Sequence, residues 1–310
     1  MLESTMYAAP PDVTAEIHTE VPEALRIRNR TSEWLYGRPG PTPHSFLEGP
    51  SFDRAGNLWL TDIVFGRIFR VSPAGDWTVV ADYDGEPNGL AFHRDGWAAI
   101  TDAKRGLLRL DPATGAVTPL VPRARREGFR GVNDCTFAMN GDLFFTDQGQ
   151  TGLQDPAGRA YRLRAGADQA DALVTNVPSP NGLVLTPDGH TLYVAATRDN
   201  AIWRVPITPD GGVIRVGRFI AMSGGLAGPD GMALDSRGNL VVAHAGMGTV
   251  WIFSRLGEPL LRIRSPRGLG ITNVCFGGPD NRDIFITESE SGTVLRTRWE
   301  HPGQPLFSHA

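Results

Sequence analysis

One sequence unit recurs six times along the chain, and this repeat limits the possible fold more than any other feature. Each copy begins with a polar residue, continues through a short apolar run and a turn, and ends in a second apolar run. The copies begin at residues 48, 88, 133, 181, 230 and 272, so successive starts lie 40 to 49 residues apart. A large apolar residue lies four positions after each start: Phe52, Phe92, Phe137, Leu185, Leu234 and Phe276. This spacing is the length of one propeller blade, so the sequence predicts an all-β, six-bladed β-propeller around a central channel.

Two further strands follow each copy and would complete a four-stranded blade. Third strands are expected at 67–71, 107–110, 160–163, 202–205, 250–253 and 294–297. Weaker fourth strands are expected at 78–81, 117–121, 172–175, 213–220 and 260–264. The sixth copy has no good fourth strand of its own, and an open sheet edge invites aggregation. We therefore expect the N-terminal residues 13–20 to fill that place and to close the ring.

We expect the chain to form one domain in two parts, an N-terminal segment (1–47) and the propeller (48–310). Besides the closing strand, we expect the segment to form an irregular cover over one face. The formal net charge of -4 lacks the basic footprint of a nucleic-acid binder. The chain has neither a run long enough for a membrane-spanning helix nor the pattern of a secretory signal, so we expect a cytoplasmic protein without a membrane partner. Cys135 and Cys275 lie in apolar strand patterns and are expected to be buried, reduced thiols.

The first residue of each copy is polar, and the inner strands of a propeller line its channel. These residues should therefore form a ring at one mouth of the channel: Glu48, Asn88, Asn133, Asn181, Asp230 and Thr272. Turn chemistry explains an Asn-Gly or Asp-Gly pair taken singly, but not Glu48, nor Asn133 followed by Asp134. Carboxylate and amide oxygens favour a hard cation such as Ca²⁺, Mg²⁺ or Mn²⁺, and Zn²⁺ also accepts oxygen ligands. The ring predicts one divalent metal ion in the channel.

A second polar circle is expected farther from the axis, where the second strand of each blade ends. Its members are Asp62, Asp102, Asp147, Thr197, His244 and Glu288. We expect Asp62 and Asp102 to accept hydrogen bonds from blade turns and neighbouring backbone. His244 and Glu288 are candidates for contact with a substrate.

Five segments, in chain order and at blade spacing, resemble the senescence marker protein/gluconolactonase/regucalcin family. They are LEGPSF at Glu48, GVNDCTF at Asn133, SPNGLVL at Asn181, GPDGMALD at Asp230 and ITNVCFGGPD at Asn273. The phrase NDCTFAMNGDLFFTDQG is more similar to bacterial gluconolactonases and drug-responsive lactonases than to animal regucalcins. The resemblance implies a six-bladed propeller that holds one divalent ion, with Ca²⁺ expected first, and that opens a small lactone, a sugar lactone above all.

The resemblance also implies roles for individual residues. Glu48, Asn181 and Asp230 correspond to the family's metal ligands. Asn133 and Asp134 correspond to its Asn-Asp pair, which contacts substrate or the metal's outer sphere, and Asn133 is an additional candidate ligand. The family's sugar-binding Arg, two residues before that pair, is replaced here by Gly131.

Other channel residues are candidates for binding substrate. The nearest arginine to the replaced position, Arg130, is one of them, together with Asn88 of the ring and His244 and Glu288 of the outer circle. Their oxygen and nitrogen atoms could contact lactone hydroxyls or the ester carbonyl.

Hydrolysis of a lactone needs a polarised carbonyl and a water molecule that loses a proton. Asp230 and Asp134 are the two candidates for the carboxylate that accepts this proton. The sequence carries neither a G-x-S-x-G elbow nor an H-E-x-x-H motif, which argues against serine and zincin hydrolases. Two alternatives stay open, a propeller phosphotriesterase or aryl esterase and a non-catalytic propeller that binds a ligand.

Overall fold

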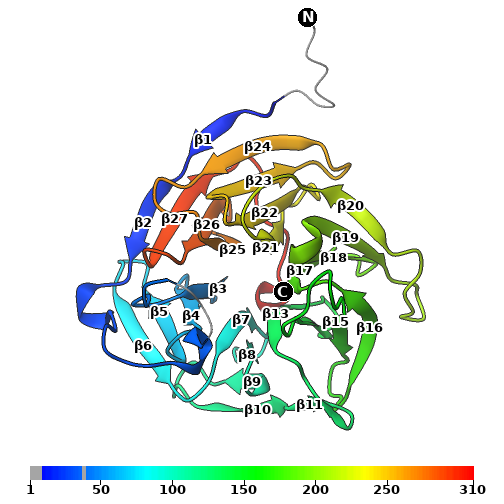
Figure 1. Ribbon diagram of the computed structural model, residues 1–310, viewed down its shortest axis with the longest axis horizontal. Helices are drawn as coiled ribbons and strands as arrows, with labels where there is room; N and C mark the ends of the chain where they lie inside the picture. The colour runs from blue at the N-terminus through cyan, green and yellow to red at the C-terminus, as the bar shows by residue number, and fades with distance from the viewer. Residues whose placement is uncertain (1–8, 37–39) are drawn as a thin grey trace, which may run out of the picture.

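The structure is a computed structural model that describes residues 9–36 and 40–310. Within these residues, six blade sheets stand radially around a central channel (Figure 1): five are four-stranded and antiparallel, and the remaining one carries a fifth, parallel strand at its outer edge. The predicted six-bladed propeller is thereby confirmed. None of the described helices is long and apolar enough to cross a membrane.

The first three blades follow the chain from the channel outward. Blade one consists of β3 (Leu47–Phe52), β4 (Leu58–Asp62), β5 (Arg67–Val71) and β6 (Trp77–Asp82). Blade two consists of β7 (Pro87–Phe92), β8 (Ala98–Asp102), β9 (Gly106–Leu110) and β10 (Val117–Val121). Blade three consists of β13 (Val132–Phe137), β14 (Leu143–Asp147), β15 (Gly158–Leu163) and β16 (Ala170–Val177). A short hairpin, β11 (Arg123–Ala124) and β12 (Glu127–Gly128), precedes blade three.

The last three blades repeat this order, with one exception at the end. Blade four consists of β17 (Pro180–Leu185), β18 (Thr191–Ala196), β19 (Ala201–Pro206) and β20 (Gly217–Ala221). Blade five consists of β21 (Gly228–Leu234), β22 (Leu240–Ala245), β23 (Thr249–Phe253) and β24 (Pro259–Arg264). Blade six consists of β25 (Ile271–Gly277), β26 (Asp283–Glu288), β27 (Thr293–Arg298) and, as its outermost strand, β2 (Glu16–Glu20).

The N-terminal segment closes the ring as expected. Strand β2 pairs antiparallel with β27, and β1 (Asp12–Thr14) adds to the outer edge of blade five by pairing parallel with β24. Asp12 forms an ion pair with Arg262, at 2.6 Å. One short segment therefore spans the outer edges of blades five and six and holds them together (Figure 1).

The fourth strand of blade four is shorter than the sequence indicates. Strand β20 begins at Gly217, whereas residues 213–220 were expected to be extended. Arg215 has a φ of 49°, in the left-handed region, which interrupts an extended chain at this point. The expected strand is therefore wrong over residues 213–216.

Residues 21–36 and 40–46 cover the face of blade one with irregular chain and two short 3₁₀ helices, η1 (Glu23–Leu25) and η2 (Glu33–Leu35). A buried ion pair fastens this cover to the propeller. Arg67 is 3% exposed and lies 2.6 Å from Asp62, which is fully buried. The same guanidinium donates a hydrogen bond to the carbonyl oxygen of Leu25, at 2.6 Å.

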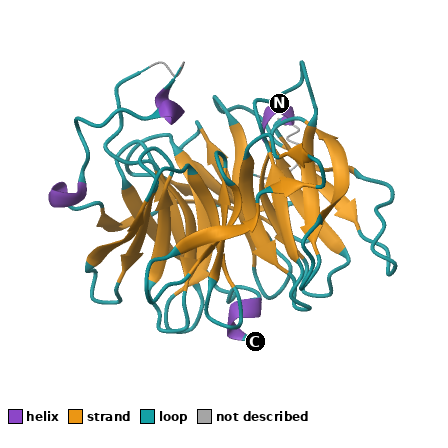
Figure 2. Cartoon of the chain, turned by 90° about the horizontal axis from the view of Figure 1, so that it is seen from below, coloured by secondary structure: helices purple, strands orange, loops and turns teal. Residues whose placement is uncertain are grey.

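The C-terminal residues close the channel from the opposite end. Figure 2 shows the C-terminus with its short helix, η4 (Phe307–His309), beyond the end of the strands and away from the N-terminal cover. The backbone N–H of Gln304 donates to the carbonyl oxygen of Leu234, at 2.9 Å. The guanidinium of Arg54 donates to the carbonyl oxygen of Ser308, at 2.6 Å. The tail is thus fixed to separate blades across the channel.

Candidate metal-binding and active site

A bulge in each inner strand positions the predicted ring. Regular pairing breaks between Glu48 and Ser51 in β3, and at the corresponding place in the other five inner strands. Bulges bend a strand and redirect its side chains. Each inner strand also packs against the next one, and β25 packs against β3, so the six bulges form a closed circle around the axis.

Five of the predicted ring residues share a buried layer at this level. Their exposed fractions are 8% or less: Glu48, Asn88, Asn133, Asn181 and Asp230. Asp134, next to Asn133, is equally buried. The structure thus largely shields these five ring donors, and the adjacent carboxylate, from bulk water.

Three of these buried residues are carboxylates that repel one another. Burial, followed by the charge of Asp134, raises the pKa of Glu48 to about 8. Burial raises the pKa of Asp134 to about 6. Burial and the charges of Glu48 and Asp134 raise the pKa of Asp230 well above its ordinary value. Within the described residues, no Lys or Arg forms an ion pair with any of the three.

Several oxygens of the ring lack a hydrogen-bond donor. Asn88 Oδ1, Asn133 Oδ1 and Asp230 Oδ1 are buried without a partner. Buried polar atoms are nearly always paired, and an unpaired set of oxygens beside repelling carboxylates suits the binding of a cation. In the described parts of the chain, no three His, Cys, Asp or Glu side chains form a metal site by themselves. Amide oxygens would therefore have to complete the ligand set, as the predicted combination of carboxylates and asparagines requires.

Asn273 joins the carboxylates, a role that the repeat did not assign to it. Its Nδ2 donates to Glu48 Oε2 at 3.1 Å and to Asp134 Oδ2 at 3.4 Å. Thr272, expected in the ring, instead donates its hydroxyl to the carbonyl oxygen of Leu47, at 2.9 Å. Its hydroxyl proton is thus engaged by a backbone acceptor in the neighbouring blade. Asn273 follows Thr272 as Asp134 follows Asn133, and this shared offset was the available signal.

Asp134 and Asn273 each follow a ring position by one residue, and together they form a second level of the channel. Glycines in the neighbouring blades make room for these two side chains. A Cβ on Gly89 would lie 2.5 Å from Asp134 Oδ1. A Cβ on Gly231 would overlap Asn273 Oδ1. Gly89 and Gly231 are thus required because Asp134 and Asn273 of the neighbouring blades occupy the space that a Cβ would need.

The outer polar circle mostly serves the backbone, as expected for Asp62 and Asp102. Asp62 Oδ1 accepts from the N–H of Phe46 at 2.8 Å, and Asp102 Oδ1 accepts from that of Lys104 at 2.9 Å. Glu288 is fully buried, and its two oxygens accept from the N–H groups of Glu290 and Ser291, at 2.9 and 3.1 Å. The structure therefore ties the Glu288 carboxylate to its own turn and does not bring it to the ring.

His244 lies fully buried beside the loop of residues 222–229. Its Nδ1 accepts a hydrogen bond from Trp251 Nε1 at 3.2 Å, which places the ring proton on Nε2. A Cβ on Gly225 would lie 2.6 Å from that Nε2, so the loop packs directly on the imidazole. Burial lowers the pKa of His244, which favours the neutral imidazole.

Arg130 lies in the loop that enters blade three. Its guanidinium is partly exposed and lies 4.0 Å from the carboxylate of Asp155. Its backbone N–H and that of Gly131 donate to Asp147 Oδ1, at 2.8 and 2.9 Å. Gly131 has a φ of 143°, a conformation that L side chains rarely adopt. The backbone here therefore favours glycine at the position where the resembled family carries its sugar-binding arginine.

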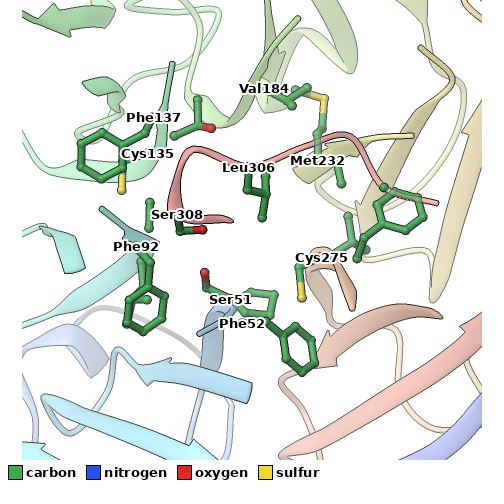
Figure 3. Close-up of a pocket in the computed structure, with 18 of the residues that line it drawn as sticks. Ser51, Phe52, Phe92, Cys135, Phe137, Val184, Met232, Cys275, Leu306 and Ser308 are labelled. Carbon is green, nitrogen blue, oxygen red and sulfur yellow. The ribbon is translucent and has the colours of Figure 1, made fainter. Parts of the chain in front are cut away.

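A cavity of about 120 Å³ lies between this second level and the C-terminal tail. Asp134 and Asn273 line it, and Figure 3 shows Leu306 and Ser308 of the tail in the middle of the side chains that surround it. The lining is otherwise largely apolar, with Phe52, Phe92, Phe137, Val184 and Met232 labelled in that view. The cavity thus forms a mainly apolar floor beneath the carboxylates.

The two cysteines also line this cavity (Figure 3). Both thiols are free, as expected, with Cys135 buried and Cys275 half-buried. Burial raises the pKa of each thiol, which keeps both protonated.

These features define a six-bladed propeller with a buried, oxygen-rich and acidic ring in its channel. The family model described as "SMP-30/Gluconolactonase/LRE-like region" matches residues 46–290. The chain belongs to this family, and the predicted resemblance is confirmed.

Curated relatives agree with this assignment. Lactonase drp35 of Staphylococcus epidermidis is 29% identical over 272 residues, which cover 81% of this chain and 82% of the relative. The gluconolactonase of Zymomonas mobilis is 31% identical over 283 residues, which cover 81% and 78%.

Solved structures share the fold. A regucalcin from Agrobacterium tumefaciens, described as a calcium-binding protein, superimposes with a TM-score of 0.78 at 24% identity and covers 97% of this chain and 99% of its own. A gluconolactonase from Xanthomonas campestris gives a TM-score of 0.72 at 24% identity, covering 96% and 99%.

Proposed function

We propose that this protein is a hydrolase that opens a small lactone and depends on one divalent cation. Glu48, Asn181 and Asp230 would hold the cation, with Asn133 as a further oxygen ligand. The observation that carries the proposal is the cluster of buried, mutually repelling carboxylates beside unpartnered oxygens. A cation would relieve this repulsion and satisfy these oxygens at once.

The relatives support lactone chemistry and, more narrowly, a sugar lactone and calcium. Curated relatives at about 30% identity are named lactonase and gluconolactonase. One structural neighbour is described as calcium-binding. Ca²⁺ also suits a site built from carboxylate and amide oxygens alone.

The positions of Asp230 and Asp134 suggest different roles for the two carboxylates. A bound cation supplies Lewis acidity toward the ester carbonyl. Asp230 would be engaged as a ligand, and this engagement weakens a carboxylate as a base. We therefore assign to Asp134 the acceptance of the proton from the attacking water. The side chain is held for this role, because its Oδ1 accepts from the N–H of Cys135 at 2.8 Å and Asn273 donates to its Oδ2.

A lactone panel tests the function. Chelated protein is resupplied with Ca²⁺, Mg²⁺, Mn²⁺ or Zn²⁺ in turn and assayed with sugar lactones, aliphatic lactones, aryl esters and organophosphates. We expect cation-dependent opening of a lactone. Preference for organophosphates or aryl esters would favour the esterase alternative, and absence of all hydrolysis by cation-loaded protein would favour a binding protein.

Two matched variants test the division of labour. Asp230→Asn should lose both cation binding and turnover. Asp134→Asn should retain cation binding, measured by calorimetry, but lose turnover by two to four orders of magnitude, roughly the contribution of general base catalysis. Turnover at the wild-type rate in Asp134→Asn would show that the base lies elsewhere.

A further inference from the structure

Gln148 makes a contact that the sequence analysis did not anticipate. It directly follows β14, at the end of the channel where the ring lies. Asn133 Nδ2 donates to Gln148 Oε1 at 3.1 Å, and Gln148 Nε2 donates to Ser179 Oγ at 3.0 Å. A chain of side-chain hydrogen bonds thus runs from a ring residue of blade three to the entrance of blade four.

Thr151 forms hydrogen bonds with the backbone of both Gln148 and Ser179. The Thr151 hydroxyl donates to the carbonyl oxygen of Gln148 at 2.7 Å, and the N–H of Ser179 donates to that hydroxyl at 3.0 Å. Ser179 itself adopts a φ of 60°, which non-glycine residues rarely occupy. Such a conformation persists only where the surroundings hold it, so Gln148 is anchored to rigid backbone.

The contact determines which way the Asn133 amide points. An asparagine amide carries a donor on one side and an acceptor on the other. Because Nδ2 is directed to Gln148, Oδ1 is directed away from it, and this oxygen is buried without a partner. A flipped amide would set Oδ1 against Gln148 Oε1, two acceptors in contact, and would leave an NH₂ group where a cation needs an oxygen.

The other two asparagines of the ring, Asn88 and Asn181, lack a side-chain partner of this kind. Within the described residues, neither Asn88 nor Asn181 makes a side-chain hydrogen bond. Among the three asparagines of the ring, Asn133 is therefore the one whose amide orientation is fixed by the protein before a ligand binds.

We propose that Gln148 is a positioning residue that holds the Asn133 amide with its oxygen toward the cation, and that Ser179 holds Gln148 in turn. The inference rests on the proposed function, since a cation is what Asn133 Oδ1 would face. Residues that hydrogen-bond to the ligands of a metal site commonly weaken its metal affinity about 10- to 100-fold when they are replaced.

Four variants test the proposal. Gln148→Met keeps the length of the side chain and removes its hydrogen bonds, whereas Gln148→Glu keeps an acceptor for Asn133. Ser179→Ala removes the anchor of Gln148. Gln150→Met, at an exposed position of the same loop, is the matched control.

The main measurement is the affinity of the chelated protein for Ca²⁺, with Zn²⁺ in parallel, by calorimetry. We expect Gln148→Met to weaken binding about 10- to 100-fold and Ser179→Ala to weaken it less. Gln148→Glu should bind at least as tightly as wild type, and Gln150→Met should match wild type. The melting temperature of Gln148→Met in chelator should stay within a few degrees of wild type, and saturating cation should restore most of its turnover.

The outcomes separate this inference from the function on which it rests. Wild-type protein that binds no divalent cation would overturn both. Cation-dependent wild-type hydrolysis with unchanged affinity in Gln148→Met would overturn the positioning role alone. So would a Gln148→Glu variant as weak as Gln148→Met, because the retained acceptor would then have no effect.

Discussion

Replacing Glu48 with glutamine should stabilise the protein without its cation and weaken it in the presence of the cation. The Glu48 carboxylate is 4% exposed and lies near Asp134 and Asp230. Glutamine preserves its shape, and its carbonyl oxygen can still accept from Asn273 Nδ2. The substitution therefore removes a charge while keeping the packing and that hydrogen bond.

The size of the effect follows from the pKa of Glu48, which rises from 4.5 to about 8 on folding. A carboxyl whose pKa is raised in the folded state favours folding at low pH, and this stability is lost as the pH rises from about 4.5 toward about 8. At pH 7 the loss spans two to three pKa units, or about 3 kcal/mol at about 1.4 kcal/mol per unit. In chelator at pH 7, Glu48→Gln should gain a free energy of unfolding of this order.

Adding cation should reverse the ranking. A ligand at one thousand times its dissociation constant stabilises the state that binds it by about 4.1 kcal/mol, which exceeds the roughly 3 kcal/mol that Glu48→Gln gains in chelator. Wild-type protein should gain this amount from Ca²⁺, and Glu48→Gln should gain little. Urea denaturation at pH 5, 7 and 8 measures the free energy of unfolding of wild type and of Glu48→Gln, each in chelator and in Ca²⁺. A Glu48→Gln variant that is no more stable than wild type in chelator at pH 7 would refute the description of a repelling carboxylate cluster.

Three further predictions concern parts of the fold outside the ring. Arg67→Met should cost about 3–5 kcal/mol in urea denaturation, because it leaves the buried Asp62 carboxylate without its countercharge; recovery in the Arg67→Met/Asp62→Asn double variant is the control, and a loss under 1 kcal/mol would contradict the buried pair. Phe307→Ala should cost about 3 kcal/mol, since the ring is 4% exposed and packs on His93 and Phe137; an unchanged melting temperature would mean that the tail does not seal the channel. The lowered pKa of His244 makes folding less favourable as the pH falls below 6.5, where the unfolded chain takes up a proton that the folded chain does not; His244→Asn should flatten the dependence of the unfolding free energy between pH 5 and 7, and an equal slope in both proteins would contradict a buried neutral imidazole.

The fold and most of the ring could be predicted because both depend on the repeat. A blade must alternate apolar strands and turns at a fixed length, so its period is visible in a single sequence. Glu48, Asn133 and Asp230 occupy one register position of that period, and the ring closes over equivalent positions by geometry alone. The closing strand was predictable for a related reason, since the last blade lacked an outer strand.

The parts that could not be predicted depend on contacts between blades. The hydroxyl of Thr272 donates to the carbonyl oxygen of Leu47, which is distant in sequence, so this contact is not visible in the repeat. Gln148 lies outside the repeat pattern, and its role appears only when its loop meets Asn133 and Ser179. The tail after residue 301 carries no strand pattern, and its fit under the channel depends on acceptors such as the carbonyl oxygen of Leu234.

The sharing of the last blade between the two ends of the chain has a consequence for biosynthesis. The ribosome makes β2 before the other strands of all six blades, but its partner β27 only after the other five blades. Until then the nascent protein is an incomplete arc with two bare sheet edges, a form prone to pairing with other chains. The interval between the synthesis of blade five and that of β27 is therefore one in which a newly made molecule is exposed to misassembly.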